Sequence, residues 1–134
     1  MHPEILAFAA AIGAVEPSED DQAYRAFRRR FRRHNYFFHP SGLFLVIKLS
    51  RHKNLFWGLG KEIVDYLNNA VPYSVILLQS ASQGWTFRKD EVNYNIERGE
   101  WKLESTGREY KIHAPPQSKM FFGPKGCQQK LGVP

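Results

Sequence analysis

Residues 43–50 read LFLVIKLS, an apolar run that a single charge, Lys48, interrupts. A short continuous apolar run with many branched side chains is typical of a strand that is buried on both faces. A second run of this kind, YSVILL, follows at residues 73–78. We therefore expect two central strands in one sheet. A helix from about 56 to 67 connects them, with Gly58 and Gly60 weakening its first turn.

Two helices are predicted before these strands. Pro3 suits a first helical turn, so one helix spans about 3–12. Ser18 caps a second helix, in which apolar residues recur every three or four positions and form one stripe, at Tyr24, Phe27 and Phe31. The sequence HPSG at 39–42 then predicts a turn.

Beyond residue 78 the elements are shorter. We expect a short strand at 84–87, a helix that Asp90 caps and Gly99 ends, and a hairpin of strands 101–104 and 108–112. Residues 114–134 hold four prolines, three glycines, three lysines and no acid, which predicts an extended or partly ordered tail. Residues 1–113 then form one α+β domain, or an α/β sandwich, with two N-terminal helices, a small mixed sheet, two further helices and a C-terminal hairpin.

Size and composition indicate a soluble, intracellular domain. The 134 residues are 43% hydrophobic and contain one cysteine, Cys127, so neither an internal disulfide nor a cysteine-rich zinc site can form. The apolar run at 5–14 is too short to span a bilayer, and the acid Glu4 precedes it rather than a basic residue. We expect a buried first helix and a cytoplasmic location.

The basic residues are concentrated in one stretch. Between Gln22 and Lys61 there are ten Lys or Arg and no Asp or Glu, whereas all thirteen acids lie elsewhere with the other nine basic residues. The stretch therefore carries +10 and the rest of the chain −4. Segregated charge of this size attracts polyanions. A solvated face that keeps the protein soluble is the alternative.

The segment YRAFRRRFRRHNYFFHP, residues 24–40, puts six arginines on one amphipathic helix and aromatic residues directly after it. The guanidinium fork donates two parallel hydrogen bonds to a phosphate and stays charged. We predict phosphate contacts from Arg25, Arg28, Arg29, Arg32 and Arg33. Lys48, Arg51 and Lys53 extend this surface if the strand end lies beside the helix. Phe37 and Phe38 are either stacking platforms for bases or core residues.

One short motif carries a catalytic hypothesis. Residues i and i+2 of a strand share a face, so Glu109-Tyr110-Lys111 aims a carboxylate and an ammonium at one point. A second carboxylate would come from Asp90, Glu97, Glu100 or Glu104. This motif resembles the acid-x-Lys element of the restriction-endonuclease-like nucleases. The resemblance implies catalysis by Glu109 and Lys111 with Glu109 as a ligand to Mg²⁺; cross-strand charge pairing is the alternative.

The order of elements after residue 43 is similar to the same family in a second way. There the acid-x-Lys strand is followed by a helix and another buried strand, as strand 43–50, the helix from about 56 and strand 73–78 are here. Lys48 takes the lysine position, but Val46 stands where the acid belongs. This alignment therefore implies a DNA-binding relative without metal-dependent cleavage as much as an active enzyme.

Three functions stay open on the sequence. The first is DNA or RNA binding through the arginine helix, without a cofactor. The second is a magnesium-dependent nuclease, and the third is an adaptor or inhibitor whose basic face binds an acidic protein. Membrane binding is not expected, because the apolar stripe of the arginine helix is needed for the core of so small a domain.

Overall fold

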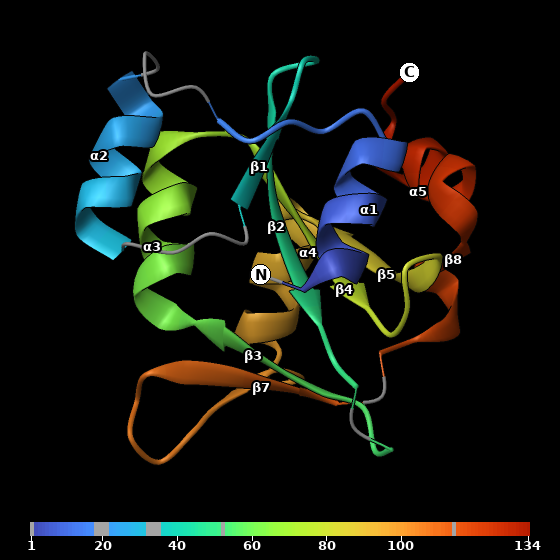
Figure 1. Cartoon of the computed structure of the whole chain (residues 1–134). Coiled ribbons are helices and arrows are strands. Elements are labelled where there is room, and N and C mark those ends of the chain that lie inside the picture. The colour runs from blue at the N-terminus through green and yellow to red at the C-terminus, as the bar shows by residue number, and fades with distance from the viewer. Residues whose placement is uncertain (1, 18–21, 32–35, 52, 114) are drawn as a thin grey trace.

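The computed structural model describes residues 2–17, 22–31, 36–51, 53–113 and 115–134. Its main sheet has five strands, which lie side by side in the order β1 (Tyr36–His39), β2 (Leu43–Leu49), β4 (Tyr73–Leu78), β5 (Gln83–Arg88) and β8 (Met120–Phe122). β2 and β4 run parallel, and the other neighbours are antiparallel. The mixed sheet confirms the predicted α+β class and both central strands (Figure 1).

Helices cover both faces of the main sheet. α1 (Pro3–Ala11) and α5 (Gly123–Leu131) lie on one face. On the other face lie α2 (Gln22–Phe31), α3 (Lys61–Ala70), α4 (Lys89–Glu97) and a second, smaller sheet. α3 connects β2 to β4, the parallel crossover that the order of apolar runs predicts. None of the described helices is both long and apolar enough to cross a membrane.

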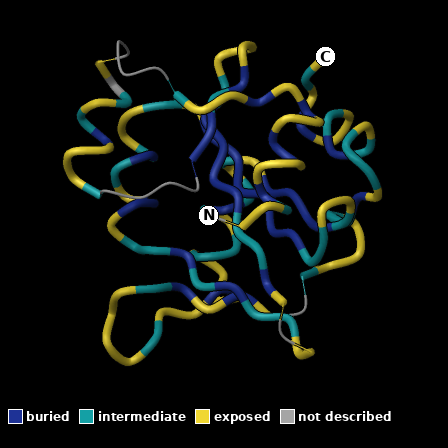
Figure 2. Tube along the Cα trace, in the orientation of Figure 1, coloured by how far each residue is buried: buried dark blue, intermediate teal, exposed yellow. Residues whose placement is uncertain are grey.

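The strands of the main sheet are buried because side chains leave them alternately toward both helix layers. Leu45 and Ile47 pack with α1 and α5, whereas Phe44 and Val46 pack with α2, α3 and the small sheet. The buried parts of the chain follow these strands through the centre of the molecule (Figure 2). Lys48 continues the second set, which places its half-buried side chain on the side of the small sheet.

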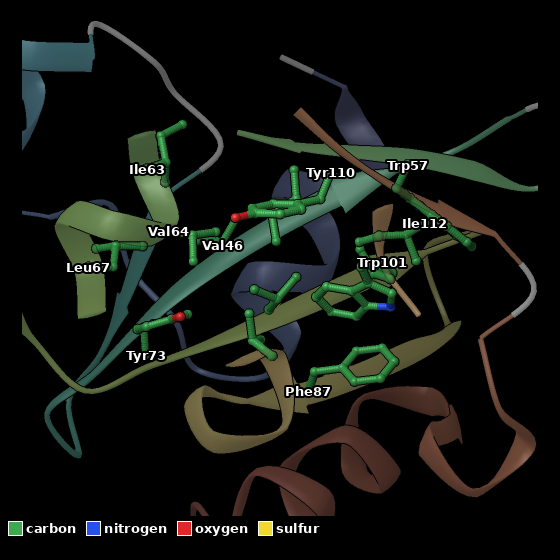
Figure 3. Close-up of a cluster of buried hydrophobic side chains, with 14 of the residues drawn as sticks. Val46, Trp57, Ile63, Val64, Leu67, Tyr73, Phe87, Trp101, Tyr110 and Ile112 are labelled. Carbon is green, nitrogen blue, oxygen red and sulfur yellow. The ribbon is translucent and has the colours of Figure 1, made fainter. Parts of the chain in front are cut away.

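The small sheet has three strands in the order β3 (Phe56–Gly60), β7 (Glu109–His113) and β6 (Lys102–Leu103). It packs against the main sheet through alternate residues (Figure 3), which are Trp57, Leu59, Tyr110 and Ile112. The indole N–H of Trp57 donates to the carbonyl of Leu78 across 3.1 Å and so joins the two sheets. Burying one such aromatic side chain contributes about 1.5–3 kcal/mol.

The prediction of a helix from residue 56 is wrong in its first turn. The sequence FWGLG at 56–60 forms β3, because Trp57 and Leu59 repeat with the period of two that a strand requires. Glycine is also among the poorest helix formers, and Gly60 precedes the first residue of α3. The helix therefore starts at Lys61.

The prediction of an extended tail after residue 114 is wrong for residues 115–134. A 3₁₀ turn (Gln117–Lys119) leads into β8, which pairs with β5, and α5 follows. Phe121, Cys127 and Leu131 are buried against the sheet. Two of the prolines and glycines mark the ends of α5: Pro124 lies in its first turn, and Gly132 ends it with a φ of 72°.

Two smaller expectations also differ from the structure. Residues 36–39, which the sequence leaves without an element, form β1 and pair with β2 across the turn at 39–42. Asp90 lies inside α4 rather than at its cap, because the helix starts at Lys89 and the side chain of Glu91 accepts from the backbone N–H of Arg88. The first helix and the C-terminal hairpin lie where the sequence predicts them.

Candidate nucleic-acid interface

The arginine face of α2 lies in solvent. Arg25, Arg28, Arg29 and Arg30 are exposed, while Phe27 on the opposite side is only 1% exposed. The spacing of three and four between apolar residues gives the helix one buried stripe and leaves the rest of its circumference to arginine. Arg32 and Arg33, also predicted as phosphate contacts, lie outside the described residues.

An aromatic cluster fixes the helix in this orientation. The ring of Phe27 lies 4.5 Å from the ring of Tyr36, 5.3 Å from that of Phe44 and 5.8 Å from that of Tyr66, measured between centroids. Tyr36 and Phe37 are themselves buried. Tyr36 and Phe37 are therefore core residues, which confirms the core interpretation of Phe37, whereas Phe38 is half-buried.

Arg30 was not among the predicted contacts and has a different position from the other arginines. Its guanidinium lies 5.5 Å from the ring centroid of Phe31 and 5.9 Å from that of Tyr66, which are cation–π contacts. It therefore lies at the border between α2 and α3. The sequence indicates this border position, because Arg30 follows Phe27 by three residues and so lies beside the apolar stripe.

A hollow of about 700 Å³ opens where α2, the start of α3 and the loop between β6 and β7 meet. Two arginines and three glutamates are among the residues that line it: Arg30, Arg108, Glu62, Glu104 and Glu109. A smaller hollow of about 390 Å³ between α2 and α3 shares Arg30 and Glu62 with it. Because acids and bases both line these hollows, they do not continue the positively charged surface of α2.

The structure brings Glu109 and Lys111 together on one face of β7, as the spacing predicts. This is the outer face of the small sheet, because Tyr110 between them is buried. Of the four predicted second carboxylates only Glu104 shares a hollow with Glu109. No three His, Cys, Asp or Glu side chains in the described ranges are grouped in a way that could hold a metal ion. Magnesium binding by Glu109 with one further carboxylate, as the resemblance implies, stays a prediction.

The basic residues after β2 do not extend the α2 surface. Figure 1 shows the bend that follows β2 at the far side of the molecule from α2. There Arg51 forms an ion pair with Glu4 of α1, and this contact lowers the pKa of the Glu4 carboxyl. Lys53 is exposed in the bend. The end of β2 does not lie beside α2, so Lys48, Arg51 and Lys53 do not join the arginine surface.

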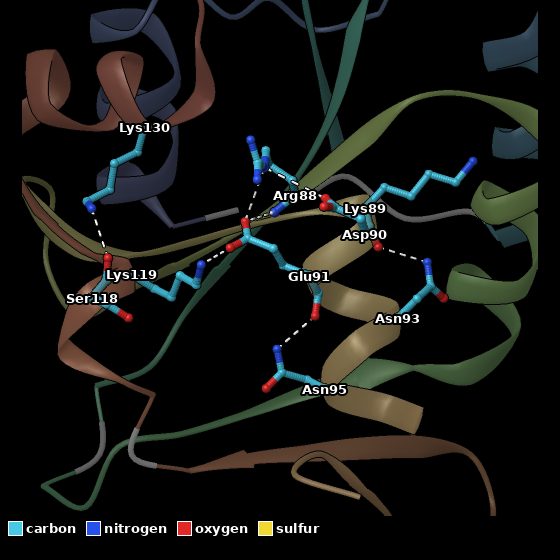
Figure 4. Close-up of polar contacts among 9 residues, drawn as sticks. All are labelled: Arg88, Lys89, Asp90, Glu91, Asn93, Asn95, Ser118, Lys119 and Lys130. Carbon is cyan, nitrogen blue, oxygen red and sulfur yellow. Dashed lines mark hydrogen bonds and ion pairs between the residues drawn. The ribbon is translucent and has the colours of Figure 1, made fainter. Parts of the chain in front are cut away.

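A second group of basic residues surrounds the start of α4, and its members contact acids or carbonyl groups (Figure 4). Glu91 forms ion pairs with both Arg88 and Lys119. The ammonium of Lys130 donates to the carbonyl of Ser118 across 2.9 Å. Lys119 thus connects the 3₁₀ turn before β8 with α4, and Lys130 connects the same turn with α5, so these cations have a structural role.

Cys127 does not offer a nucleophile. It is fully buried in α5, and burial raises the pKa of its thiol to about 12. The thiolate, which is the reactive form, is therefore scarce at neutral pH.

No protein-family model, no curated protein and no solved structure matches this chain. The resemblance to the restriction-endonuclease-like nucleases stays a prediction.

Proposed function

We propose that this protein binds nucleic acid through its phosphate backbone, with Arg25, Arg28 and Arg29 of α2 as the principal contacts. The observation that carries the proposal is an exposed arginine face, held outward by the burial of Phe27, on a helix without a single acid. Each phosphate that an arginine neutralises releases counterions, so binding weakens steeply as salt rises.

The burial of the apolar stripe favours nucleic acid over a membrane surface. A basic amphipathic helix binds lipid by inserting its apolar side. In α2 that side is occupied, because Phe27 and Phe31 contact Tyr66 of α3 within 5.8 Å between ring centroids. An acidic protein partner remains the alternative, and it is an outcome of the experiment below.

The experiment compares two triple variants that remove the same charge. Arg25→Gln, Arg28→Gln and Arg29→Gln together remove three arginines from α2. The matched control removes Lys53, Arg98 and Lys125, which are exposed in the bend after β2, at the end of α4 and on α5. Binding of fluorescein-labelled DNA and RNA is followed by fluorescence anisotropy at several salt concentrations.

We expect the α2 variant to lose about a hundredfold or more in affinity, since each charge-assisted hydrogen bond contributes about 1.5–3 kcal/mol. Its salt slope falls by about 0.9 for each lost contact to duplex DNA. The control variant stays close to the wild type. Equal losses in both variants would mean that only net charge matters and would contradict the proposal. If the protein binds an acidic protein and no nucleic acid, the acidic-partner alternative would replace the proposed function.

The nuclease hypothesis is tested in the same titration by adding magnesium. Cleavage of the labelled strand that Glu109→Gln abolishes, with binding kept, would support it. Loss of cleavage in Glu109→Gln would assign the catalytic role to this residue, and no cleavage by the wild type would contradict the hypothesis.

A further inference from the structure

The outer face of the small sheet is open to solvent, and we call it the open sheet face. On β7 the inward residues Tyr110 and Ile112 are buried, whereas Lys111 and His113 between and after them are exposed. Register places Phe56 opposite His113 and Gly58 opposite Lys111. Lys102 of β6 lies opposite Lys111 on its other side. These five residues, from three strands, thus lie on one surface.

Two like charges on this face destabilise the small sheet. Lys102 and Lys111 are direct cross-strand neighbours, and like charges in that position destabilise a sheet. Neither side chain forms an ion pair or hydrogen bond with any part of the chain that the structure describes. Glu109 is the one acid at the strand positions of the face. An anion bound between the two lysines would relieve their repulsion.

An aromatic pair lies at one end of the face. The ring centroids of Phe56 and His113 are 5.1 Å apart, with 39° between the ring planes. His113 is exposed and Phe56 is half-buried. Residues two apart on a strand are separated by about 7 Å, so the rings and Lys111 lie within the span of one nucleotide. Stacking of a base on such a ring is worth about five- to a hundredfold in affinity.

Gly58 lies beside Lys111 on the neighbouring strand β3. Gly58 carries no side chain, and the carboxylate of Glu109 lies over it instead. Glycine at this position makes room for that carboxylate, because a Cβ there would clash with it. Glu109 and Glu104, which line the same hollow, are the acids that oppose an anion here.

We propose that the open sheet face binds unpaired nucleotides of a single-stranded nucleic acid, with a base against Phe56 and His113 and phosphates at Lys102 and Lys111. This rests on the proposed function and adds to it a preference for single strands. The carboxylates of an acidic peptide would pair with Lys102 and Lys111, but nothing in its acidic side chains would stack on Phe56 and His113. A duplex would satisfy the lysines too, but its bases are stacked inside the helix.

The test uses labelled oligothymidylate and oligouridylate of about 20 nucleotides, a length that exceeds a typical single-strand site, and a DNA duplex of the same length. Phe56→Leu keeps the apolar volume but removes the aromatic ring. Lys102→Gln and Lys111→Gln together remove the charge pair at exposed positions. Lys125→Gln on α5 is the matched charge control. Circular dichroism verifies that each variant is folded.

We expect Phe56→Leu to weaken binding to the single strands fivefold or more and to leave duplex binding within twofold. The lysine variant lowers the single-strand salt slope by about 0.7 for each lysine, whereas Lys125→Gln does not. Glu109→Gln strengthens single-strand binding. Oligothymidylate and oligouridylate separate DNA from RNA as the natural source.

Two results would overturn this inference, and they are distinguishable. If the wild type binds none of the probes at low salt, the proposed function fails and this inference with it. If the wild type binds but the Phe56 and lysine variants keep its single-strand affinity, or lose single-strand and duplex affinity equally, the open sheet face is not a single-strand site. The α2 proposal then stands without it.

Discussion

At the start of α4 the basic side chains contact acids and carbonyl groups, whereas on α2 Arg25 and Arg29 contact no acid among the described residues. Arg88 and Lys119 share Glu91, and Lys89 donates to the carbonyl of Asn68 across 2.9 Å. Both regions lie on the surface of the same small protein. The cations at α4 therefore serve the fold, whereas Arg25 and Arg29 are left to the partner that we propose.

The same difference has an energetic consequence. A charge that is paired inside the fold adds a little stability, and a concentration of like charges subtracts from it through self-repulsion. Removing cations should therefore have opposite effects in the two regions. Variants near α4 should be less stable, whereas variants on α2 should be slightly more stable and should lose ligand binding.

The largest effect on stability is expected for Glu91→Ala. This change removes the acceptor for the backbone N–H of Arg88, 3.0 Å away, together with the partner of Lys119. Loss of a helix cap of this kind costs about 0.5–2 kcal/mol. Glu91→Gln keeps the acceptor and should cost less than half as much. Urea unfolding measures the stability of both variants. Equal losses would mean that Glu91 stabilises the fold through its ion pairs and not through the helix cap.

A somewhat smaller effect is expected for Tyr73→Phe, in the hydrogen-bond network that holds α4 against α3. The Tyr73 hydroxyl donates to the side-chain carbonyl of Asn68 across 2.7 Å, and the amides of Asn68 and Asn93 bond to each other. Removing one such bond costs about 1 kcal/mol. Urea unfolding at neutral pH measures this loss.

The same variant has a signature in its pH dependence. Burial is the main cause that raises the pKa of Tyr73 to about 12, whereas an unfolded tyrosine titrates near about 10. The folded state thus holds this proton more tightly, so its contribution to stability is complete below about pH 10 and is lost as the pH rises toward 12. The difference between wild type and Tyr73→Phe should shift in that alkaline range. A constant difference up to the highest pH would contradict the buried position of the phenol.

The smallest effect on stability is expected for Arg25→Gln combined with Arg29→Gln. Surface substitutions without a structural partner stay within about 0.5 kcal/mol, and here the sign should favour stability because repulsion is relieved. The unfolding midpoint in urea at low salt is the measurement. A loss of more than about 1 kcal/mol would show that these arginines serve the fold, and the contrast between the two regions would disappear.

The sequence predicts those elements whose signal is local. β2 and β4 are continuous apolar runs, and the stripe of α2 is visible in its spacing, so both the central strands and the exposed side of the arginine helix could be predicted. β3 was mistaken for a helical turn, since five residues with two glycines carry too short a pattern to separate a period of two from the start of a helix.

The C-terminal error has a different cause. The composition of residues 114–134 predicts a tail, but the positions of single residues indicate a helix. Pro124 near the start and Gly132 after the end of α5 are typical helix limits, and Cys127 and Leu131 have helical spacing. Of the open sheet face, the sequence predicts that Glu109 and Lys111 share one side of a strand. The place of Phe56 beside His113 depends on pairing between β3 and β7, which are far apart in sequence, so a local pattern does not predict it.

The most direct test of the central claim is a titration of the wild-type protein with labelled single-stranded and duplex nucleic acid, by fluorescence anisotropy, at salt concentrations from about 50 to 200 mM. We predict binding at low salt that falls with a steep linear slope of log K against log salt for every sequence. The absence of binding at the lowest salt, or binding that does not respond to salt, would contradict an arginine surface made for phosphates.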